Sequence, residues 1–119
     1  MKLTNHEIYE YATNLTTFKI EGKLPIKINF FLQKNIQTLT AAAQEIETAR
    51  MEIARSFGKL NEEGDQYVIP QESIDTVNQE LNDLFFLEQD LPIHTFKLDD
   101  FDGIEVTYDQ MAAIMFMID

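Results

Sequence analysis

The chain has 119 residues, the usual size of one domain, and we predict a single domain over residues 1–119. It contains no cysteine, which excludes disulfides, thiolate zinc sites, iron–sulfur clusters and thiol nucleophiles. Its net charge of −12 is uneven: Met1–Lys59 has eight basic against six acidic residues, whereas Leu60–Asp119 has one basic residue, Lys97, against fifteen acidic ones. Such an acidic half disfavours nucleic-acid phosphates and anionic membranes as ligands and favours a basic protein surface.

Hydrophobic residues make up 45% of the chain and include nine Phe, which is enough to build a core and argues against disorder. The polar start of the sequence predicts no secretory signal peptide. The longest apolar runs, such as Met111–Ile118, are too short to span a bilayer. We therefore expect a soluble, cytoplasmic protein.

The first predicted helix runs from about Thr4 to Thr17. Thr4 and Glu7 have the spacing of a capping box, in which each side chain satisfies a backbone N–H of the first turn. The following segment, Phe18–Leu24, is predicted to be a connection or a short extended piece, because it contains Gly22 and ends before a proline.

A long helix is predicted from Pro25 to Phe57. Pro25 suits the first turn of a helix, and no Gly or Pro interrupts the chain until Gly58, the predicted C-cap. At 1.5 Å per residue this helix is about 45–50 Å long. Apolar residues recur along it every seven positions and form a predicted oligomer seam: Leu32, Leu39, Ile46 and Ile53.

A turn at Asn61–Gly64 and a short strand at Gln66–Ile69 are predicted next, with Pro70 ending the strand. A third helix is predicted from about Gln71 to Glu88. One of its faces is apolar. The opposite face is an acidic stripe: Glu72, Asp75, Glu80 and Asp83.

The last part is predicted as an extended segment Leu91–Leu98, a tight turn Asp100–Gly103 and a short extended piece Ile104–Val106. Thr107 and Gln110 form a second capping box that opens a final helix ending near Ile118. The predicted fold is mainly α: a long central helix, shorter helices packed along it, and room for a small two- or three-stranded β-sheet as a minor α+β component.

Several segments, taken in order, carry a resemblance to a known family: Lys23–Lys27, Gly64–Ile69, Asn78–Leu84, Leu98–Glu105 and Val106–Met111. In these the chain resembles an uncharacterised family of small proteins encoded by bacteriophages and prophages of Gram-positive bacteria. The resemblance implies a phage origin, a helical domain and a location in the host cell, and it brings no biochemical activity. Many members of that family have proline where this chain has Tyr108.

The acidic run Asp99–Glu105 invites comparison with a calcium-binding loop. An EF-hand needs oxygen ligands at positions one, three and five and glycine at six. Starting at Asp100 puts Ile104 at position five, and starting at Asp99 puts Phe101 at position three. The register fails both ways, so we predict no metal site and interpret this run as a solvated turn.

Catalytic motifs are absent from the sequence. His6 and His94 are the only histidines, and neither has a second histidine at helical spacing. The four glycines are scattered, so no phosphate-binding loop is formed. We predict a protein that is not an enzyme and needs no cofactor.

The leading functional prediction is a small acidic phage accessory protein that acts by protein–protein interaction. Through its acidic half it would inhibit or modulate a host protein, as a mimic of nucleic acid. The alternative is a virion or tail assembly protein that oligomerises through its long helix, in the simplest case as a homodimer. The methionine-rich last helix is interpreted as core in preference to an adaptable contact surface. The predicted interaction residues are Glu72, Asp75, Glu80, Asp83, Asp99, Asp100 and Asp102.

Overall fold

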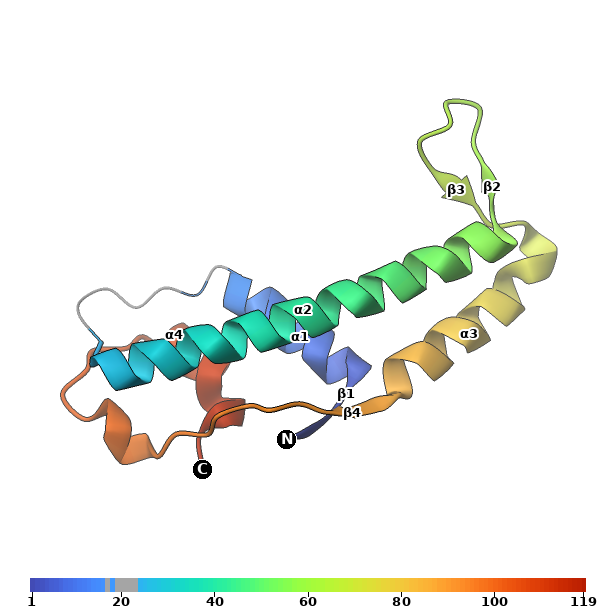
Figure 1. The fold of residues 1–119 in the computed structure, drawn as a ribbon. Helices are drawn as coiled ribbons and strands as arrows, with labels where there is room; N and C mark the ends of the chain where they lie inside the picture. The colour runs from blue at the N-terminus through green and yellow to red at the C-terminus, as the bar shows by residue number, and fades with distance from the viewer. Residues whose placement is uncertain (17, 19–23) are drawn as a thin grey trace.

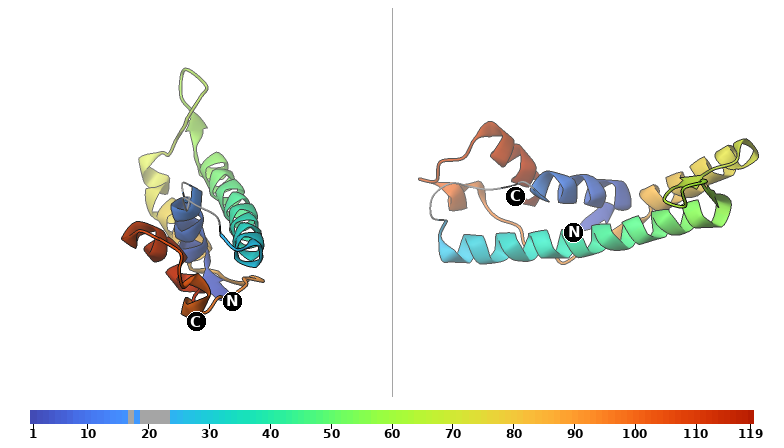
Figure 2. Two further views of the ribbon diagram at one scale, coloured as in Figure 1. Left: turned by 90° about the vertical axis from the view of Figure 1, so that its left-hand side faces the viewer. Right: turned by 90° about the horizontal axis from the view of Figure 1, so that it is seen from above.

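The computed structural model describes residues 1–16, 18 and 24–119 and is elongated, measuring 56 × 30 × 21 Å (Figure 1). Its Cα radius of gyration is 18.2 Å, whereas a compact domain of this length has about 13.5 Å. The fold is mainly α with a minor β component, as predicted. Figure 2 shows that the other elements lie along one long helix, which runs the length of the molecule.

The chain begins with strand β1 (Lys2–Thr4) and helix α1 (Asn5–Thr16). The predicted capping box is present: the Thr4 N–H donates to Glu7 Oε1 at 3.0 Å, and the Glu7 N–H donates to Thr4 Oγ1 at 3.1 Å. Most of the predicted connection 18–24 lies outside the described residues.

Helix α2 (Ile26–Phe57) is the predicted long helix, with Pro25 at its N-cap and Gly58 at its C-cap. Gly58 has φ −95°, so its backbone is extended rather than left-handed. Glycine is required there by contact, because a Cβ would lie 2.6 Å from the Ala54 carbonyl oxygen and 3.1 Å from Tyr67 Cβ.

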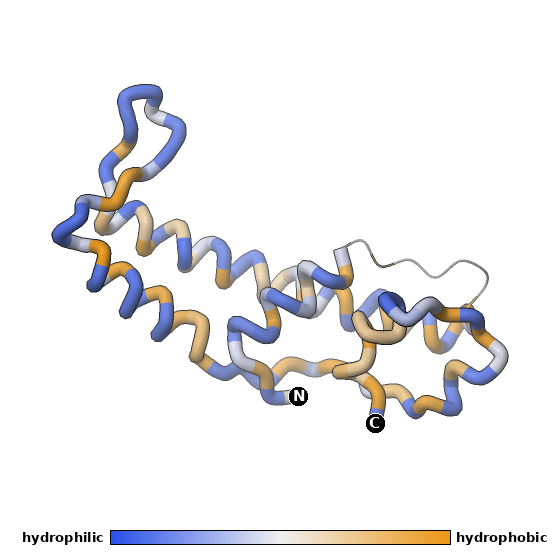
Figure 3. The backbone as a smooth tube through the Cα atoms, turned by 180° about the vertical axis from the view of Figure 1, so that it is seen from behind, coloured by the Kyte–Doolittle hydropathy of each residue, from blue (hydrophilic) through white to orange (hydrophobic). Residues whose placement is uncertain are grey.

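Strands β2 (Lys59–Leu60) and β3 (Tyr67–Val68) form an antiparallel hairpin beyond the end of α2. The predicted turn contains Gly64, whose φ of +73° favours glycine. The loop of this hairpin is hydrophilic (Figure 3).

The predicted third helix begins with a 3₁₀ turn, η1 (Gln71–Ser73), and continues as α3 (Ile74–Phe86). It ends two residues earlier than predicted, because the chain turns extended at Leu87 and pairs as β4 (Glu88–Asp90) with β1. The β1–β4 pairing joins the N-terminal segment to residues 88–90, a contact that the sequence did not predict.

The remaining chain follows α2 as an extended segment and closes with η2 (Leu98–Phe101), α4 (Tyr108–Ile114) and η3 (Met115–Met117). The second capping box is present, with the Gln110 N–H donating to Thr107 Oγ1 at 3.1 Å. The predicted extended piece 104–106 forms no strand. The last helix is mixed in character, because Ile114 and Met117 are fully buried whereas Met115 is half exposed.

The core follows α2 from Ile28 to Ile46 and does not reach the C-terminal end of that helix. It is one cluster of buried side chains from α1, the first part of α2 and the C-terminal segment. We call the rest of the molecule the arm, residues 47–83: the end of α2, the β2–β3 hairpin, η1 and most of α3. In the arm only Val77 is buried among the residues described, because two helices and a hairpin provide no third layer.

Two buried asparagines tie the segments together. The Asn35 side chain donates to the His94 carbonyl oxygen and accepts from the His94 N–H, both at 2.8 Å. Asn5 Nδ2 donates to the Leu84 carbonyl oxygen at 2.8 Å, and Asn5 Oδ1 accepts from Gln89 at 2.7 Å. Asn35 thus pairs both backbone groups of His94, whereas Asn5 joins the start of α1 to the end of α3 and to Gln89, and both side chains are buried without an unmet hydrogen bond.

Candidate interaction surfaces

The acidic stripe lies on the outer face of η1 and α3. Glu72, Asp75, Glu80 and Asp83 are all exposed, and no basic residue occurs in either helix. The opposite face packs on α2 through Val77, and Leu81 and Leu84 beside it are half buried. Ile74, another apolar residue in the first turn of α3, is 42% exposed. The structure thus brings the four predicted carboxylates together on one projecting surface.

The other predicted acidic residues lie elsewhere. Asp99 and Asp100 are in η2, and Asp102 follows it, at the end of the molecule away from the arm (Figures 1 and 2). Asp100 also has a structural role, since its Oδ2 accepts a hydrogen bond from the Lys97 N–H at 3.0 Å. The seven predicted interaction residues therefore lie in two separate groups, four on η1 and α3 and three in and just after η2.

The predicted oligomer seam is largely used within the chain. Leu32, Leu39 and Ile46 are 1%, 0% and 2% exposed, because α1 and the C-terminal segment cover this side of α2. Only Ile53, in the arm, is half buried. Three of the four seam residues are thus unavailable to a second copy in this fold, and the prediction is corrected for them.

A hollow opens on the arm between α2, the hairpin and α3, with a volume of about 230 Å³. We call it the arm hollow. Its lining was not among the predicted site residues and consists of Arg50, Ile53, Ala54, Tyr67, Ile69, Val77 and Leu81. Arg50 donates to both carboxylate oxygens of Glu47, and this hydrogen bonding holds the pKa of Glu47 below its ordinary value and raises the pKa of Arg50.

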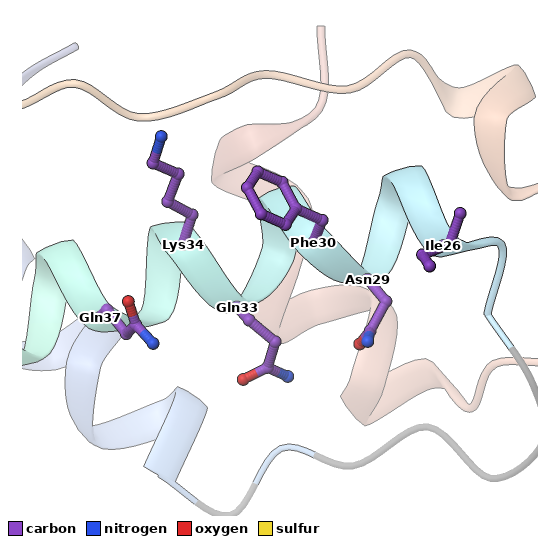
Figure 4. Close-up of a pocket in the computed structure, with 6 residues that line it drawn as sticks. All are labelled: Ile26, Asn29, Phe30, Gln33, Lys34 and Gln37. Atoms are coloured by element: carbon purple, nitrogen blue, oxygen red, sulfur yellow. The ribbon is translucent and has the colours of Figure 1, made fainter.

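A second hollow, of about 370 Å³, lies at the N-terminal end of α2 (Figure 4). Ile26 and Phe30 are 87% and 58% exposed there, and Lys34 Nζ lies 5.7 Å from the centre of the Phe30 ring. Asn29, Gln33 and Gln37 complete its described lining. All six residues come from one helix, and Lys34 is the only one of the six with an ionisable side chain.

The two histidines lie in different segments and make different contacts. His6 is exposed on α1 with Nε2 3.7 Å from Glu10, whereas His94 stacks on Phe31 with ring centres 3.9 Å apart. Over residues 1–16, 18 and 24–119 there is no group of three or more His, Cys, Asp or Glu that could hold a metal ion. In the same residues no helix is long and apolar enough to cross a membrane.

Asn35 is the structural residue that sequence reasoning should have found. It lies three residues after Leu32 and four before Leu39, which is the spacing of the buried face. A polar residue at such a position signals a specific hydrogen-bonding partner. The arm hollow gave no comparable signal, since its walls come from three separate segments.

Comparisons with known proteins give no relative. No protein-family model, curated protein or solved structure matches the chain. The resemblance to a phage-encoded family therefore remains a prediction, and function has to be argued from the geometry.

Proposed function

We propose that the protein works by binding another protein, and that the acidic stripe on the arm contacts a basic surface of that partner. The observation that carries the proposal is the placement of Glu72, Asp75, Glu80 and Asp83. They lie exposed on a projecting helix without one basic residue to neutralise them. Uncompensated charge of one sign steers an oppositely charged partner and speeds its encounter.

The surface area of the molecule supports a binding role. The solvent-accessible surface is 8425 Å², whereas a compact monomer of 13.8 kDa exposes about 6,600 Å². The excess of about 1,800 Å² is larger than the roughly 800 Å² that one partner buries in a standard protein–protein interface. Exposing this extra surface to water lowers the stability of a lone domain, and a partner that covers the arm would bury part of that surface.

The charge spacing suits a partner that normally holds nucleic acid. From Glu72 to Asp83 the helix rises about 16 Å. One strand of DNA has about five phosphates over the same distance. Four carboxylates in that length approach the charge density of a strand, so we infer that the stripe occupies a basic groove on a host nucleic-acid-binding protein and inhibits or modulates it.

A charge-reversal variant tests this proposal. Glu72, Asp75, Glu80 and Asp83 are replaced by Lys, and parent and variant are used to capture proteins from a host-cell lysate at low and high salt. We expect the parent to retain a partner whose binding falls with salt, and the variant to lose it. The matched control reverses four exposed acids away from the stripe: Glu45, Asp99, Asp102 and Glu105. Equal capture by the stripe variant and the parent would contradict the proposal.

The alternative, a virion or tail assembly protein that oligomerises through α2, has weaker support. Its predicted contacts Leu32, Leu39 and Ile46 are covered within the chain. Light scattering over the micromolar range separates the two proposals. A mass near 13.8 kDa would remove the homodimer, whereas twice that mass would favour assembly.

A further inference from the structure

We propose that the arm hollow is the anchor site of the partner, and that it accepts one large apolar side chain from a segment flanked by Lys or Arg. This inference rests on the proposed function, because it names what the partner must present. It adds a second kind of contact to the acidic stripe, one that decides which cationic segment binds.

The walls of the arm hollow are apolar. Ile53 and Ala54 come from α2, Ile69 follows the hairpin, and Val77 and Leu81 come from α3. Arg50 and Tyr67 complete the lining, and Arg50 is already paired with Glu47. Burying this exposed apolar surface against a partner is favourable, because it removes the surface from water.

The size of the hollow selects the occupant. Its volume of about 230 Å³ is below the range of about 300–1,000 Å³ that is usual for small-molecule sites. An apolar cavity of about 150 Å³ already holds a benzene molecule. One leucine, methionine or phenylalanine side chain therefore fits, and anchors of this kind supply most of the affinity in protein interfaces.

The charge of the arm decides between a foreign segment and a second copy. Residues 47–83 contain nine acids and three bases, a net charge of −6. Two of the bases, Arg50 and Arg55, are paired with Glu47 and Glu52. Two such arms would repel each other on approach, whereas Lys or Arg beside an apolar anchor would be attracted.

Three synthetic peptides test the inference by methyl NMR on the full chain. The first has two central leucines between lysine pairs, the second has alanines in place of the leucines, and the third has glutamates in place of the lysines. We expect the first to bind at least tenfold more tightly than the second and to shift the methyl signals of Ile53, Ile69, Val77 and Leu81. We expect the third not to bind.

Filling the hollow provides a second test. Ala54→Leu places a larger side chain in it, and Ala41→Leu is the matched control on an exposed position of the same helix. Ala54→Leu should weaken the leucine peptide about tenfold and leave the alanine peptide unchanged, whereas Ala41→Leu should change neither. The peptide comparison uses the parent chain, so it stands even if Ala54→Leu fails to fold.

The outcomes separate the two proposals. Equal binding of the leucine and alanine peptides would overturn the anchor site and leave the acidic stripe in place. Failure of both lysine peptides to bind would overturn the anchor site and count against the stripe. Concentration-dependent shifts of the same methyl groups without peptide, together with a doubled mass, would assign the hollow to a second copy and overturn the inference.

Discussion

Asn35 should hold the extended segment around His94 on the long helix, and its removal should be costly. Its amide makes two hydrogen bonds of 2.8 Å to the His94 backbone, and the side chain is only 1% exposed. Asn35→Leu keeps the volume but leaves the His94 N–H and carbonyl oxygen without their partner. An unsatisfied buried group costs about 1–3 kcal/mol, so two partly buried groups together should cost roughly 2–4 kcal/mol.

That loss is large beside a total stability of about 5–15 kcal/mol. For a domain of this size it corresponds to a fall in Tm of roughly 8–16 °C. Urea unfolding followed by circular dichroism measures the free energy directly, with Gln37→Leu as a control at an exposed amide on the same helix. A loss below about 0.5 kcal/mol, the usual effect of a surface substitution, would refute the view that Asn35 holds this segment.

Three further predictions concern single features. Gly58→Ala should destabilise the chain by about 1–3 kcal/mol through contact with the Ala54 carbonyl oxygen, whereas Gly64→Ala should cost about 1–2 kcal/mol through its positive φ alone, both measured by urea unfolding. Because Arg50 lowers the pKa of Glu47, the pair stabilises the fold above the ordinary glutamate pKa and loses that effect as the pH falls through the lowered value. Arg50→Gln should therefore return the pKa of Glu47 toward its ordinary value in a carboxyl NMR titration, and no change would contradict the pairing. Micromolar calcium or zinc should leave Tm unchanged, and a chelator-sensitive rise of more than a few degrees would disprove the predicted absence of a metal site.

Features that depend on neighbours in the sequence were predictable. The capping boxes at Thr4 and Thr107, and the long helix between Pro25 and Gly58, follow from residues within one or two helical turns, and all are confirmed. The short strand before Pro70 is confirmed for the same reason, since turn residues and a proline bound it.

Features that depend on distant partners were not predictable from such signals. β1 has only three residues, two of them polar, and becomes a strand because it pairs with residues 88–90. The arm hollow and the contact of Asn35 with His94 likewise join segments that lie far apart along the chain. The sequence predicts that α2 has a buried face, but which segments cover that face is decided only by folding.

The separation of the acidic residues changes what the charge of the chain can do. Fields of exposed charges decay over about 8 Å at physiological ionic strength, whereas the molecule is 56 Å long. The carboxylates around η2 and those of the arm lie at opposite ends, so they cannot act on one contact, and a partner that approaches the arm meets a net charge of −6 rather than the −14 of the whole second half. Because the buried core cluster contains no arm residue, the charges on the arm can be reversed without disturbing the core. Loss of binding in such a variant would then report on the contact surface itself and not on the stability of the fold.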